Sequence, residues 1–319
     1  MENTTYSLRE ADRVEILILM DNYVDILLTP TDVASRPPLA RGNEMPEETL
    51  LAEHGLSLYV TAYRGDHRHS ILFDTGYTNI GVPHNIGHLG LNLDDLEAIV
   101  LSHGHMDHTG SLYSILDSLK REVPLVLHPD AFLFPRYILP EKGEPIFFPM
   151  TLKRENLKER AVNVMEKKSP TLLTEDLVMV TGEIERVTPF EKGLPNAFVD
   201  REGTREVDLI LDDQSLILNL KGKGLVVISG CSHAGIVNTA LFARKMTGIE
   251  TIHGLIGGFH LSGPFFEQII DHTIEALKEM APQVLVPMHC TGWKATHRFA
   301  EAFPASFALS SVGSRIILS

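Results

Sequence analysis

Three imidazoles and one carboxylate lie within a stretch of six residues in the segment Ser102–Gly110, Ser-His-Gly-His-Met-Asp-His-Thr-Gly. Neutral imidazole nitrogen and carboxylate oxygen suit zinc and similar divalent ions, and Gly104 and Gly110 allow tight backbone turns. Structural zinc sites usually use cysteine pairs, and no cysteine lies near this segment. The alternative is a surface histidine cluster without function. The pattern favours a catalytic metal site with coordination positions open to water, held by His103, His105, Asp107 and His108.

Two further segments carry a histidine and a cysteine at the end of an apolar run. Gly230–Gly235 reads Gly-Cys-Ser-His-Ala-Gly, and Pro287–Gly292 reads Pro-Met-His-Cys-Thr-Gly. Both cysteines of the chain therefore lie one or two residues from a histidine. We expect the three histidine-bearing loops to meet at one edge of the sheets, which adds His233 and His289 to the candidate ligands.

Short apolar runs bounded by turn or charged residues predict the strands that position these loops. In the first half of the chain they are Val14–Met20, Leu56–Tyr63, Ser70–Phe73, Ala98–Leu101 and Leu125–His128. Helical spacing then predicts a helix directly after the first histidine cluster, marked by Leu112, Ile115, Leu116 and Leu119. Side chains at such a strand-to-helix loop can converge on one point.

The second half of the chain repeats this arrangement. Strands are predicted at Leu209–Asp212, Ser215–Leu220, Leu225–Ser229 and Val284–Pro287, with a tight turn at Lys221–Gly224. Helical periodicity returns at Ile236–Leu241 and at Phe266–Leu277. Between the halves, residues 131–205 are richer in Pro, Glu and Lys and less periodic. We therefore predict one α/β domain over residues 1–319, with 131–205 as an insertion or lid that covers the site.

The composition is that of a packed globular protein and argues against several other classes. With 42 acidic residues against 28 Lys and Arg, the formal net charge of the 319-residue chain is −14, so nucleic acid is not an expected partner. A hydrophobic fraction of 44% is ordinary for a globular core. No apolar run approaches the roughly 20 residues that span a bilayer. The polar N-terminal segment lacks the features of a secretory signal, and we expect a cytoplasmic protein without membrane contact.

Taken together, these motifs resemble those of the metallo-β-lactamase superfamily over nearly the whole chain. The resemblance rests on the strand ending in Phe73-Asp74-Thr75-Gly76, on the first histidine cluster, and on His233 and His289. It implies an αββα sandwich with a mono- or dinuclear metal site at its edge. It further implies that Asp74 orients the ligands through hydrogen bonds. The implied ligands are His103, His105 and His233 for the first metal, and Asp107, His108 and His289 for the second.

One position departs from the superfamily pattern. Cys231 stands where members usually carry a metal-bridging aspartate, and His233 follows it by two residues rather than lying in the preceding loop. Cys231 could be a thiolate ligand or a small buried residue. Alternatively, Asp212 or Asp213 supplies the missing carboxylate from the neighbouring strand end.

A closer resemblance connects the chain to the dihydropterin ribofuranosylaminobenzene-phosphate synthase group. It rests on five segments: 20–22 (Met-Asp-Asn), 53–57 (Glu-His-Gly-Leu-Ser), 181–186 (Thr-Gly-Glu-Ile-Glu-Arg), 230–238 (Gly-Cys-Ser-His-Ala-Gly-Ile-Val-Asn) and 257–261 (Gly-Gly-Phe-His-Leu). Among their residues, His260 could contact a metal or the substrate, or be structural. Asn22, His54 and Arg186 are candidate substrate contacts that could equally cap turns or form solvated ion pairs.

Hydrolysis is the chemistry that we expect from this site. Divalent ions lower the pKa of bound water and polarise carbonyl or phosphoryl oxygen. We therefore expect a metal-dependent hydrolase of ester or phosphoester substrates, with Asp107 and His260 as catalytic residues. The expected cofactor is one or two zinc ions, with manganese or iron as alternatives. The expected partner is a small-molecule substrate, which could carry a phosphate.

Three alternatives to hydrolysis remain at this point. The first is transferase chemistry of the synthase group, on a phosphorylated substrate of the pterin pathway. The second is redox chemistry, although the related diiron proteins carry Glu where His105 stands and have a flavin domain that this sequence lacks. The third is a metal-binding scaffold without turnover. The joint presence of His103, His105, Asp107, His108 and His289 argues against that scaffold, because losing one ligand weakens a site sharply.

Overall fold

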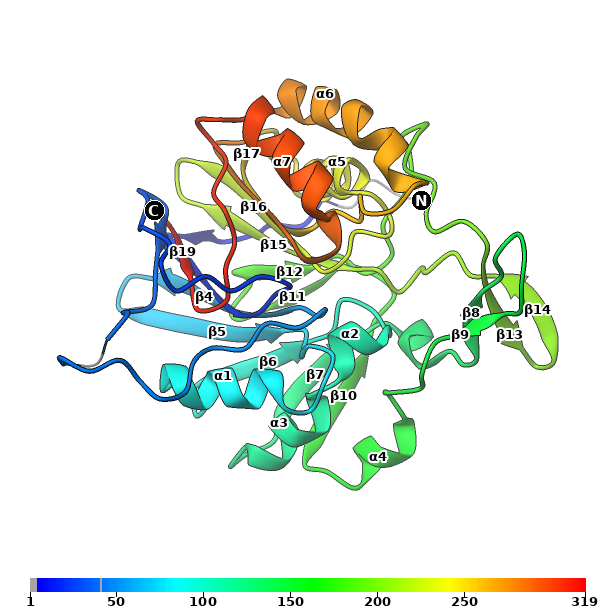
Figure 1. Cartoon of the computed structure of the whole chain (residues 1–319), viewed down its shortest axis with the longest axis horizontal. Helices are drawn as coiled ribbons and strands as arrows, with labels where there is room; N and C mark the ends of the chain where they lie inside the picture. The colour runs from blue at the N-terminus through cyan, green and yellow to red at the C-terminus, as the bar shows by residue number, and fades with distance from the viewer. Residues whose placement is uncertain (1–4, 41) are drawn as a thin grey trace.

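The computed structural model describes residues 5–40 and 42–319, and within them two large sheets face each other with helices on both outer faces (Figure 1). This is the αββα sandwich that the sequence predicted. A smaller third sheet projects from the sandwich at the right of Figure 1.

The first large sheet combines parallel and antiparallel pairing. Strands β5, β6, β7 and β10 pair in parallel, whereas β5, β4, β2, β19 and β3 pair antiparallel. Parallel strands end at the same edge of a sheet, so the loops after β5, β6 and β7 are neighbours. In spatial order the described strands are β10 (Val162–Glu166), β7 (Val123–Leu127), β6 (Leu96–Val100), β5 (His67–Phe73), β4 (Ser57–Arg64), β2 (Arg13–Met20), β19 (Arg315–Leu318) and β3 (Ala34–Ser35).

The second large sheet has the same mixture of pairing. Its strands β16, β17 and β18 are parallel, so their C-terminal loops also share one edge. Its described strands are, in order, β11 (Thr171–Leu173), β12 (Val178–Val180), β15 (Ser215–Leu220), β16 (Gly224–Ser229), β17 (Ile252–Gly258) and β18 (Val284–Met288), while β1 (Glu10–Ala11) pairs beside β15. The small sheet consists of β14 (Thr204–Val207), β13 (Ala197–Arg201), β8 (Arg136–Ile138) and β9 (Ile146–Phe147).

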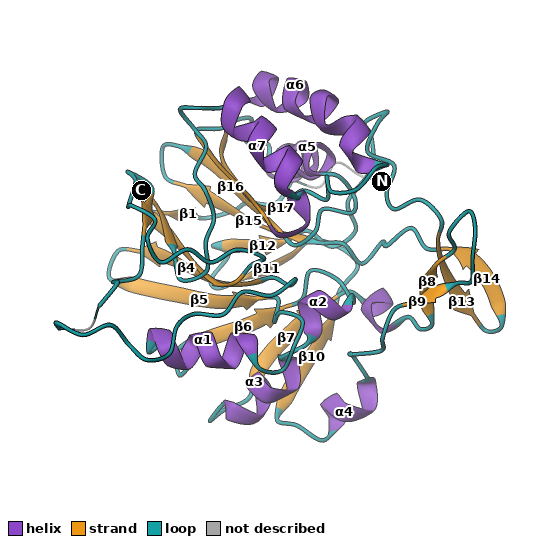
Figure 2. Ribbon diagram, in the orientation of Figure 1, coloured by secondary structure: helices purple, strands orange, loops and turns teal. Residues whose placement is uncertain are grey.

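The helices flank the two large sheets (Figure 2). Helices α1 and α3 lie on the outer face of the first sheet, and α5, α6 and α7 lie on that of the second. The helices are α1 (Gly81–Leu89), α2 (Met106–Thr109), α3 (Leu112–Ser118), α4 (Arg154–Lys158), α5 (Ile236–Thr247), α6 (Ile270–Met280) and α7 (Trp293–Ala302), with short 3-10 helices at Pro129–Phe132, Phe266–Ile269 and His289–Thr291.

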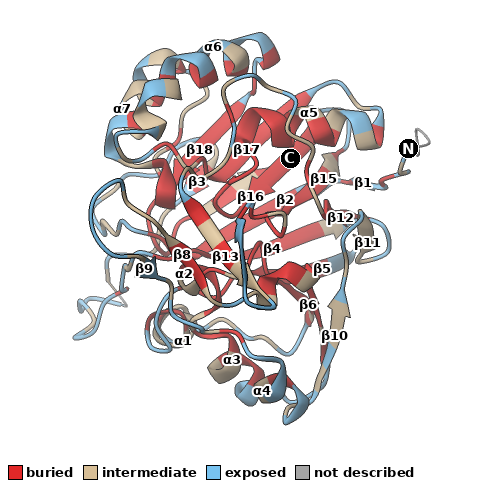
Figure 3. Cartoon of the chain, turned by 90° about the vertical axis from the view of Figure 1, so that its right-hand side faces the viewer, coloured by how far each residue is buried: buried red, intermediate tan, exposed pale blue. Residues whose placement is uncertain are grey.

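Alternating side chains divide the core into three layers. Figure 3 shows that the buried residues are concentrated in the strands of the two large sheets. On β2, Ile16 and Ile18 pack between the two sheets, whereas Leu17 and Leu19 pack under the helices of the first layer. On β16, Val226 enters the space between the sheets and its neighbours face α5. Because successive side chains of a strand point to opposite faces, strands buried on both faces read as continuous apolar runs.

Two details differ from the sequence prediction. The strand predicted at Leu209–Asp212 was wrong: these residues form an irregular turn in which Ile210 has a positive φ of 48°. The segment 131–205 is not one continuous addition to the sandwich, because β10 extends the first sheet and β11 and β12 extend the second. The small sheet accounts for the part of this segment that stands apart. The weaker periodicity of the segment reflects strands that are short and partly or fully exposed.

Within the part of the chain that the structure describes, no helix is both long and apolar enough to cross a bilayer.

Candidate metal centre

The predicted ligands come together from loops that follow strands of both large sheets. His103 and His105 follow β6, and the helical turn α2 then carries the next two candidates. From the facing sheet, Cys231 and His233 follow β16, and His289 follows β18. The candidate ligands therefore converge at the edge where parallel strands end in both sheets.

One group of ligands, which we call the imidazole cluster, consists of His103, His105 and His233, all buried. One nitrogen from each ring lies within 4.8 Å of those of the other two. The Nε2 atom of His103 is 3.0 Å from Nδ1 of His105 and 3.2 Å from Nε2 of His233. A neutral imidazole has a single N–H and a single lone pair. Nε2 of His103 can therefore form a good hydrogen bond with only one of its two neighbouring ring nitrogens at a time.

Burial keeps the rings of the imidazole cluster neutral. It lowers the pKa of His103 and His233 well below the ordinary value, and the neighbouring imidazoles act in the same direction. Burial, with the charge of Arg136, lowers the pKa of His105 to about 3. Metal binding to these rings therefore displaces no proton near neutral pH.

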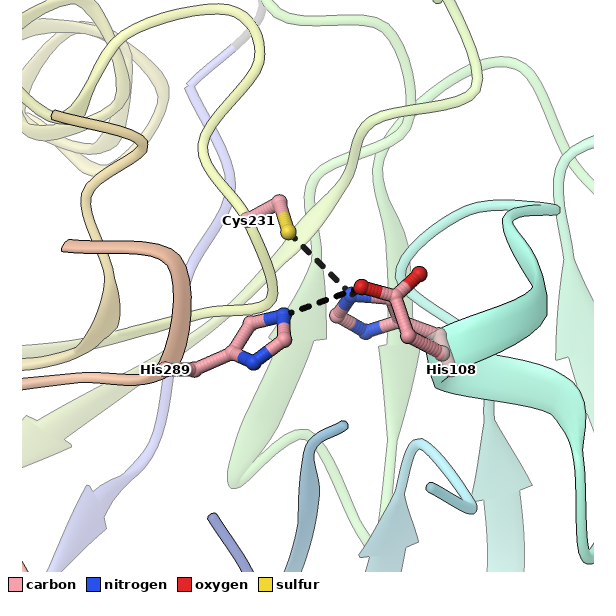
Figure 4. Close-up of side chains that lie close together, drawn as sticks. His108, Cys231 and His289 are labelled. Atoms are coloured by element: carbon pink, nitrogen blue, oxygen red, sulfur yellow. Dashed lines mark hydrogen bonds and ion pairs between the residues drawn. The ribbon is translucent and has the colours of Figure 1, made fainter. Parts of the chain in front are cut away.

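The second group, which we call the mixed cluster, consists of Asp107, His108, Cys231 and His289. Figure 4 shows His108, Cys231 and His289 converging from three segments. The Nε2 atom of His108 is 3.1 Å from Sγ of Cys231, and Nε2 of His289 is 3.3 Å from Oδ2 of Asp107. This group contains a carboxylate and a thiol in addition to imidazoles.

Asp74 orients His108 from behind the mixed cluster. Its buried carboxylate lies 2.6 Å from Nδ1 of His108 and accepts hydrogen bonds from the backbone N–H and the hydroxyl of Ser102. With Nδ1 held by Asp74, Nε2 of His108 faces the cluster, which is the ligand-orienting role expected for Asp74.

Neighbouring charges shift the pKa values of His108 and Asp107 in the mixed cluster. Burial opposes the charged form of His108, but Asp74 and Asp107 outweigh it and raise the pKa of His108 to about 9. Burial would raise the pKa of Asp107, yet His108 and His289 hold it below its usual range. Burial also raises the pKa of the Cys231 thiol. Without a metal, this cluster is therefore a carboxylate beside a protonated imidazole and a neutral thiol.

Neither aspartate considered as a replacement ligand belongs to these groups. Asp212 pairs with Arg136 at 2.6 Å and accepts a hydrogen bond from the backbone N–H of Gly104 at 2.8 Å. Burial opposes its charge, but Arg136 lowers its pKa to about 2. Asp213 accepts from the backbone N–H of Ala234 at 2.8 Å, and burial raises its pKa to about 6. Both carboxylates therefore support the histidine loops through the backbone.

His260 and Arg186 occupy different surroundings. The ring of His260 lies 4.2 Å from that of His233 and 4.5 Å from that of Phe266, measured between centroids. His260 forms a further group of potential ligands with Cys231 and His233. Arg186 instead donates to the backbone carbonyls of Leu209 and His233, so its guanidinium fixes the loop behind the site.

Asn22 and His54 lie beside His289 on the exposed side of the mixed cluster. The centroids of the His54 and His289 rings are 5.0 Å apart, and Nε2 of His54 is 3.6 Å from Oδ2 of Asp107. The amide of Asn22 contacts both rings. Burial, followed by the charge of His289, lowers the pKa of His54.

The sequence did not reveal two residues that shape the site. Arg136, on β8, anchors Asp212 and Asp208 and thereby the loop of His105. Phe148 packs its ring edge-on against that of His105, with centroids 4.9 Å apart. Both lie in the segment 131–205, where neither residue type nor spacing distinguishes them from other residues.

The residues present fit a divalent metal centre. Among the described residues, two buried ring nitrogens of the imidazole cluster have no hydrogen-bond partner: Nε2 of His105 and Nδ1 of His233. Unpaired buried polar atoms are costly and rare unless a ligand or ion satisfies them. The donor types, imidazole with carboxylate and thiolate, are those that zinc and related ions bind.

Comparisons with known proteins agree with this geometry. Residues 55–175 match the family described as the metallo-beta-lactamase superfamily. The chain is 33% identical over 258 residues, 80% of its length and 87% of the relative, to the 7,8-dihydropterin-6-methyl-4-(beta-D-ribofuranosyl)-aminobenzene-5'-phosphate synthase of Methanocaldococcus jannaschii. It is 30% identical to the uncharacterized protein MJ0448 of the same organism, over 79% of this chain and 89% of that protein.

Among solved structures, the fold is similar to that of Tm1679, described as a metal-dependent hydrolase of the beta-lactamase superfamily. The TM-score is 0.70 at 25% identity, covering 96% of this chain and 98% of that chain. The chain belongs to the metallo-β-lactamase superfamily. Within it, the chain is similar to the ribofuranosylaminobenzene-phosphate synthase, as the five sequence segments indicated.

Proposed function

We propose that this protein is a metal-dependent hydrolase that acts on a small ester or phosphoester substrate. The observation that carries the proposal is the convergence of seven buried donor residues into two adjacent groups, with two unpaired ring nitrogens. In this proposal the imidazole cluster holds one divalent ion, preferably zinc. Asp107, His108 and His289 hold a second, and Cys231 contributes its thiolate.

The chain's own residues divide the work at this centre. Bound divalent ions would supply a Lewis acid and acidify water. Asp107 is the proton acceptor in the proposal, since its carboxylate is ionised and adjoins both His289 and His54. His260 lies against His233 and is placed to donate a hydrogen bond to an oxygen on which negative charge develops. Phe148 and its neighbours restrict access from the side of His105.

The second candidate is a synthase. The relative that is 33% identical over most of both chains carries a synthase name. In this alternative the same ligands hold a phosphorylated substrate while a leaving group departs from the pterin methyl carbon, and the amine of the aminobenzene partner attacks that carbon and gives up its proton. The two functions therefore share the metal centre and differ in whether water is a reactant.

A substrate panel separates the two proposals. Metal-loaded protein is assayed against phosphodiesters, lactones and thioesters, and separately against a ribofuranosylaminobenzene 5'-phosphate, as the arylamine, with a dihydropterin whose 6-methyl carbon carries a pyrophosphate leaving group. Hydrolysis that disappears in His103→Ala/His105→Ala but persists in the surface variant His297→Ala supports the hydrolase. Pyrophosphate release that requires the arylamine, without hydrolysis of any panel member, supports the synthase and overturns our first proposal.

A further inference from the structure

The side chain of Asn22 contacts two histidines, His54 and His289, on the exposed side of the mixed cluster. Its amide nitrogen is 3.1 Å from Nδ1 of His54 and its amide oxygen is 3.1 Å from Nδ1 of His289. We infer that Asn22 is a positioning residue that fixes the proton on both rings, so that His54 offers an Nε2–H donor to an oxygen of the substrate. The substrate contact rests on the proposed function, whereas the proton positions do not.

The orientation of the Asn22 amide follows from its third contact. Its nitrogen lies 3.2 Å from the backbone carbonyl oxygen of His289, an atom that can only accept. An amide turned by 180° would place two oxygens against each other. The buried carboxylate of Asp21 holds this arrangement together, because it accepts from the backbone N–H groups of both Asn22 and His289.

With the amide fixed, the ring protons follow. The NH2 group of Asn22 has two hydrogens, which serve the carbonyl of His289 and Nδ1 of His54. Nδ1 of His54 is therefore an acceptor, and the proton of the neutral ring is on Nε2. The amide oxygen accepts from Nδ1 of His289, which places a proton on that nitrogen and leaves Nε2 as the ring nitrogen that faces Asp107 at 3.3 Å. A single amide thus imposes opposite tautomers on two neighbouring rings.

The opposite tautomers suit different tasks. The ring of His289 is buried and turns Nε2, the nitrogen that would bind a metal, towards the cluster. The side chain of His54 is 63% exposed, and its Nε2–H lies 3.6 Å from Oδ2 of Asp107, at the rim of the same cluster. A group in that position is accessible to substrate and donates a hydrogen bond. The chemical class that it recognises is an acceptor oxygen, such as an ester carbonyl or a phosphoryl oxygen.

The tautomers can be read by NMR on the full-length protein labelled with ¹⁵N-histidine, with His54→Gln used to assign His54. We expect the wild-type proton on Nε2 of His54 and on Nδ1 of His289. In Asn22→Asp, a carboxylate oxygen replaces the NH2 group, so His54 should acquire a proton on Nδ1 while His289 keeps its own. A wild-type His54 protonated at Nδ1 alone, or a proton pattern unchanged in Asn22→Asp, would overturn the inference. The measurement does not depend on turnover, so it stands if the proposed hydrolase activity fails.

Binding of inorganic phosphate to zinc-loaded protein tests the donor role. His54→Phe retains a ring beside His289 but loses the N–H, and we expect affinity about three- to tenfold weaker, the effect of one hydrogen bond. His54→Gln restores a donor and should recover part of this loss. His67→Phe, at an exposed histidine outside the site, should bind as wild type does. Equal phosphate affinity in wild type and His54→Phe, at equal zinc content, would contradict the donor role.

Discussion

The imidazole cluster and the mixed cluster are built at the same edge of the sandwich but have opposite electrostatics. The imidazole cluster contains only neutral donors, because burial and neighbouring imidazoles or Arg136 depress the pKa of its rings. The mixed cluster holds an ionised Asp107 next to His108, whose pKa is raised to about 9. Adjacent ligand groups therefore need not bind metal under the same conditions. The rings of the imidazole cluster carry no extra proton at neutral pH, whereas His108 in the mixed cluster must first release one.

The pH dependence of metal affinity should separate the clusters most strongly. His108 carries a proton below about pH 9 in the metal-free protein, so zinc must displace it. Affinity at the mixed cluster should therefore rise about tenfold per pH unit between pH 7 and 9 from the His108 proton alone. The rise should be steeper, and should continue above pH 9, where the Cys231 thiol also releases its proton to bind as the thiolate. The imidazole cluster should vary little over this range. Zinc titration against a chelator at several pH values measures both, and parallel pH profiles would remove the distinction.

Replacing the carboxylate behind His108 should give the next largest effect. Asp74→Asn keeps the size of the side chain but removes the charge that holds Nδ1 of His108. Loss of such a supporting hydrogen bond typically costs 10- to about 100-fold in metal affinity. We expect that loss at the mixed cluster alone, measured by competition for zinc. Asp95→Asn, in an exposed ion pair with Arg68, is the matched control.

Cys231 gives the mixed cluster a sulfur atom as a potential metal ligand, which the imidazole cluster lacks. If its thiolate binds metal, cobalt-substituted protein should show a sulfur-to-cobalt charge-transfer band, and Cys231→Ser should lose that band together with about tenfold of the affinity at the mixed cluster. Cys290→Ser tests whether the second buried thiol contributes. A band that survives in Cys231→Ser would show that Cys231 is a small buried residue and not a metal ligand.

The smallest effect should come from the aromatic wall on the side of the imidazole cluster. Phe148→Ala removes the ring that packs on His105 but no donor atom. We expect a change of several-fold in KM among substrates of different bulk, with unchanged metal content. Phe147→Ala, at an exposed position next to it, is the control. A loss of metal in Phe148→Ala would show that this wall supports the ligands rather than selecting substrates.

Much of the metal centre could be predicted from sequence because its ligands are local in the chain. His103, His105, Asp107 and His108 belong to one short segment, and apolar runs before it and before Cys231 marked strands whose ends meet. What could not be predicted depends on contacts between distant residues. Arg136 and Asp212 are 76 positions apart in the chain, and no local sequence pattern indicates that they form an ion pair.

The strand prediction at Leu209–Asp212 failed for a related reason. Its apolar residues suggested burial within a sheet, but Asp212 is held in a turn by Arg136 and by Gly104, and Ile210 adopts a left-handed conformation. The division of 131–205 between two large sheets and a small one likewise depends on pairing with β7 and β15, which short half-exposed strands do not specify alone.

The central claim is that two separate clusters each hold a metal ion, and metal stoichiometry tests it most directly. Elemental analysis is applied to wild type, to His103→Ala/His105→Ala, to Asp107→Ala/His289→Ala and to the combination of all four substitutions. We predict two equivalents in wild type, one in each double variant and none in the combination, with circular dichroism confirming that each variant folds. Folded wild-type protein that binds no divalent metal when supplied with zinc, manganese or iron would contradict it.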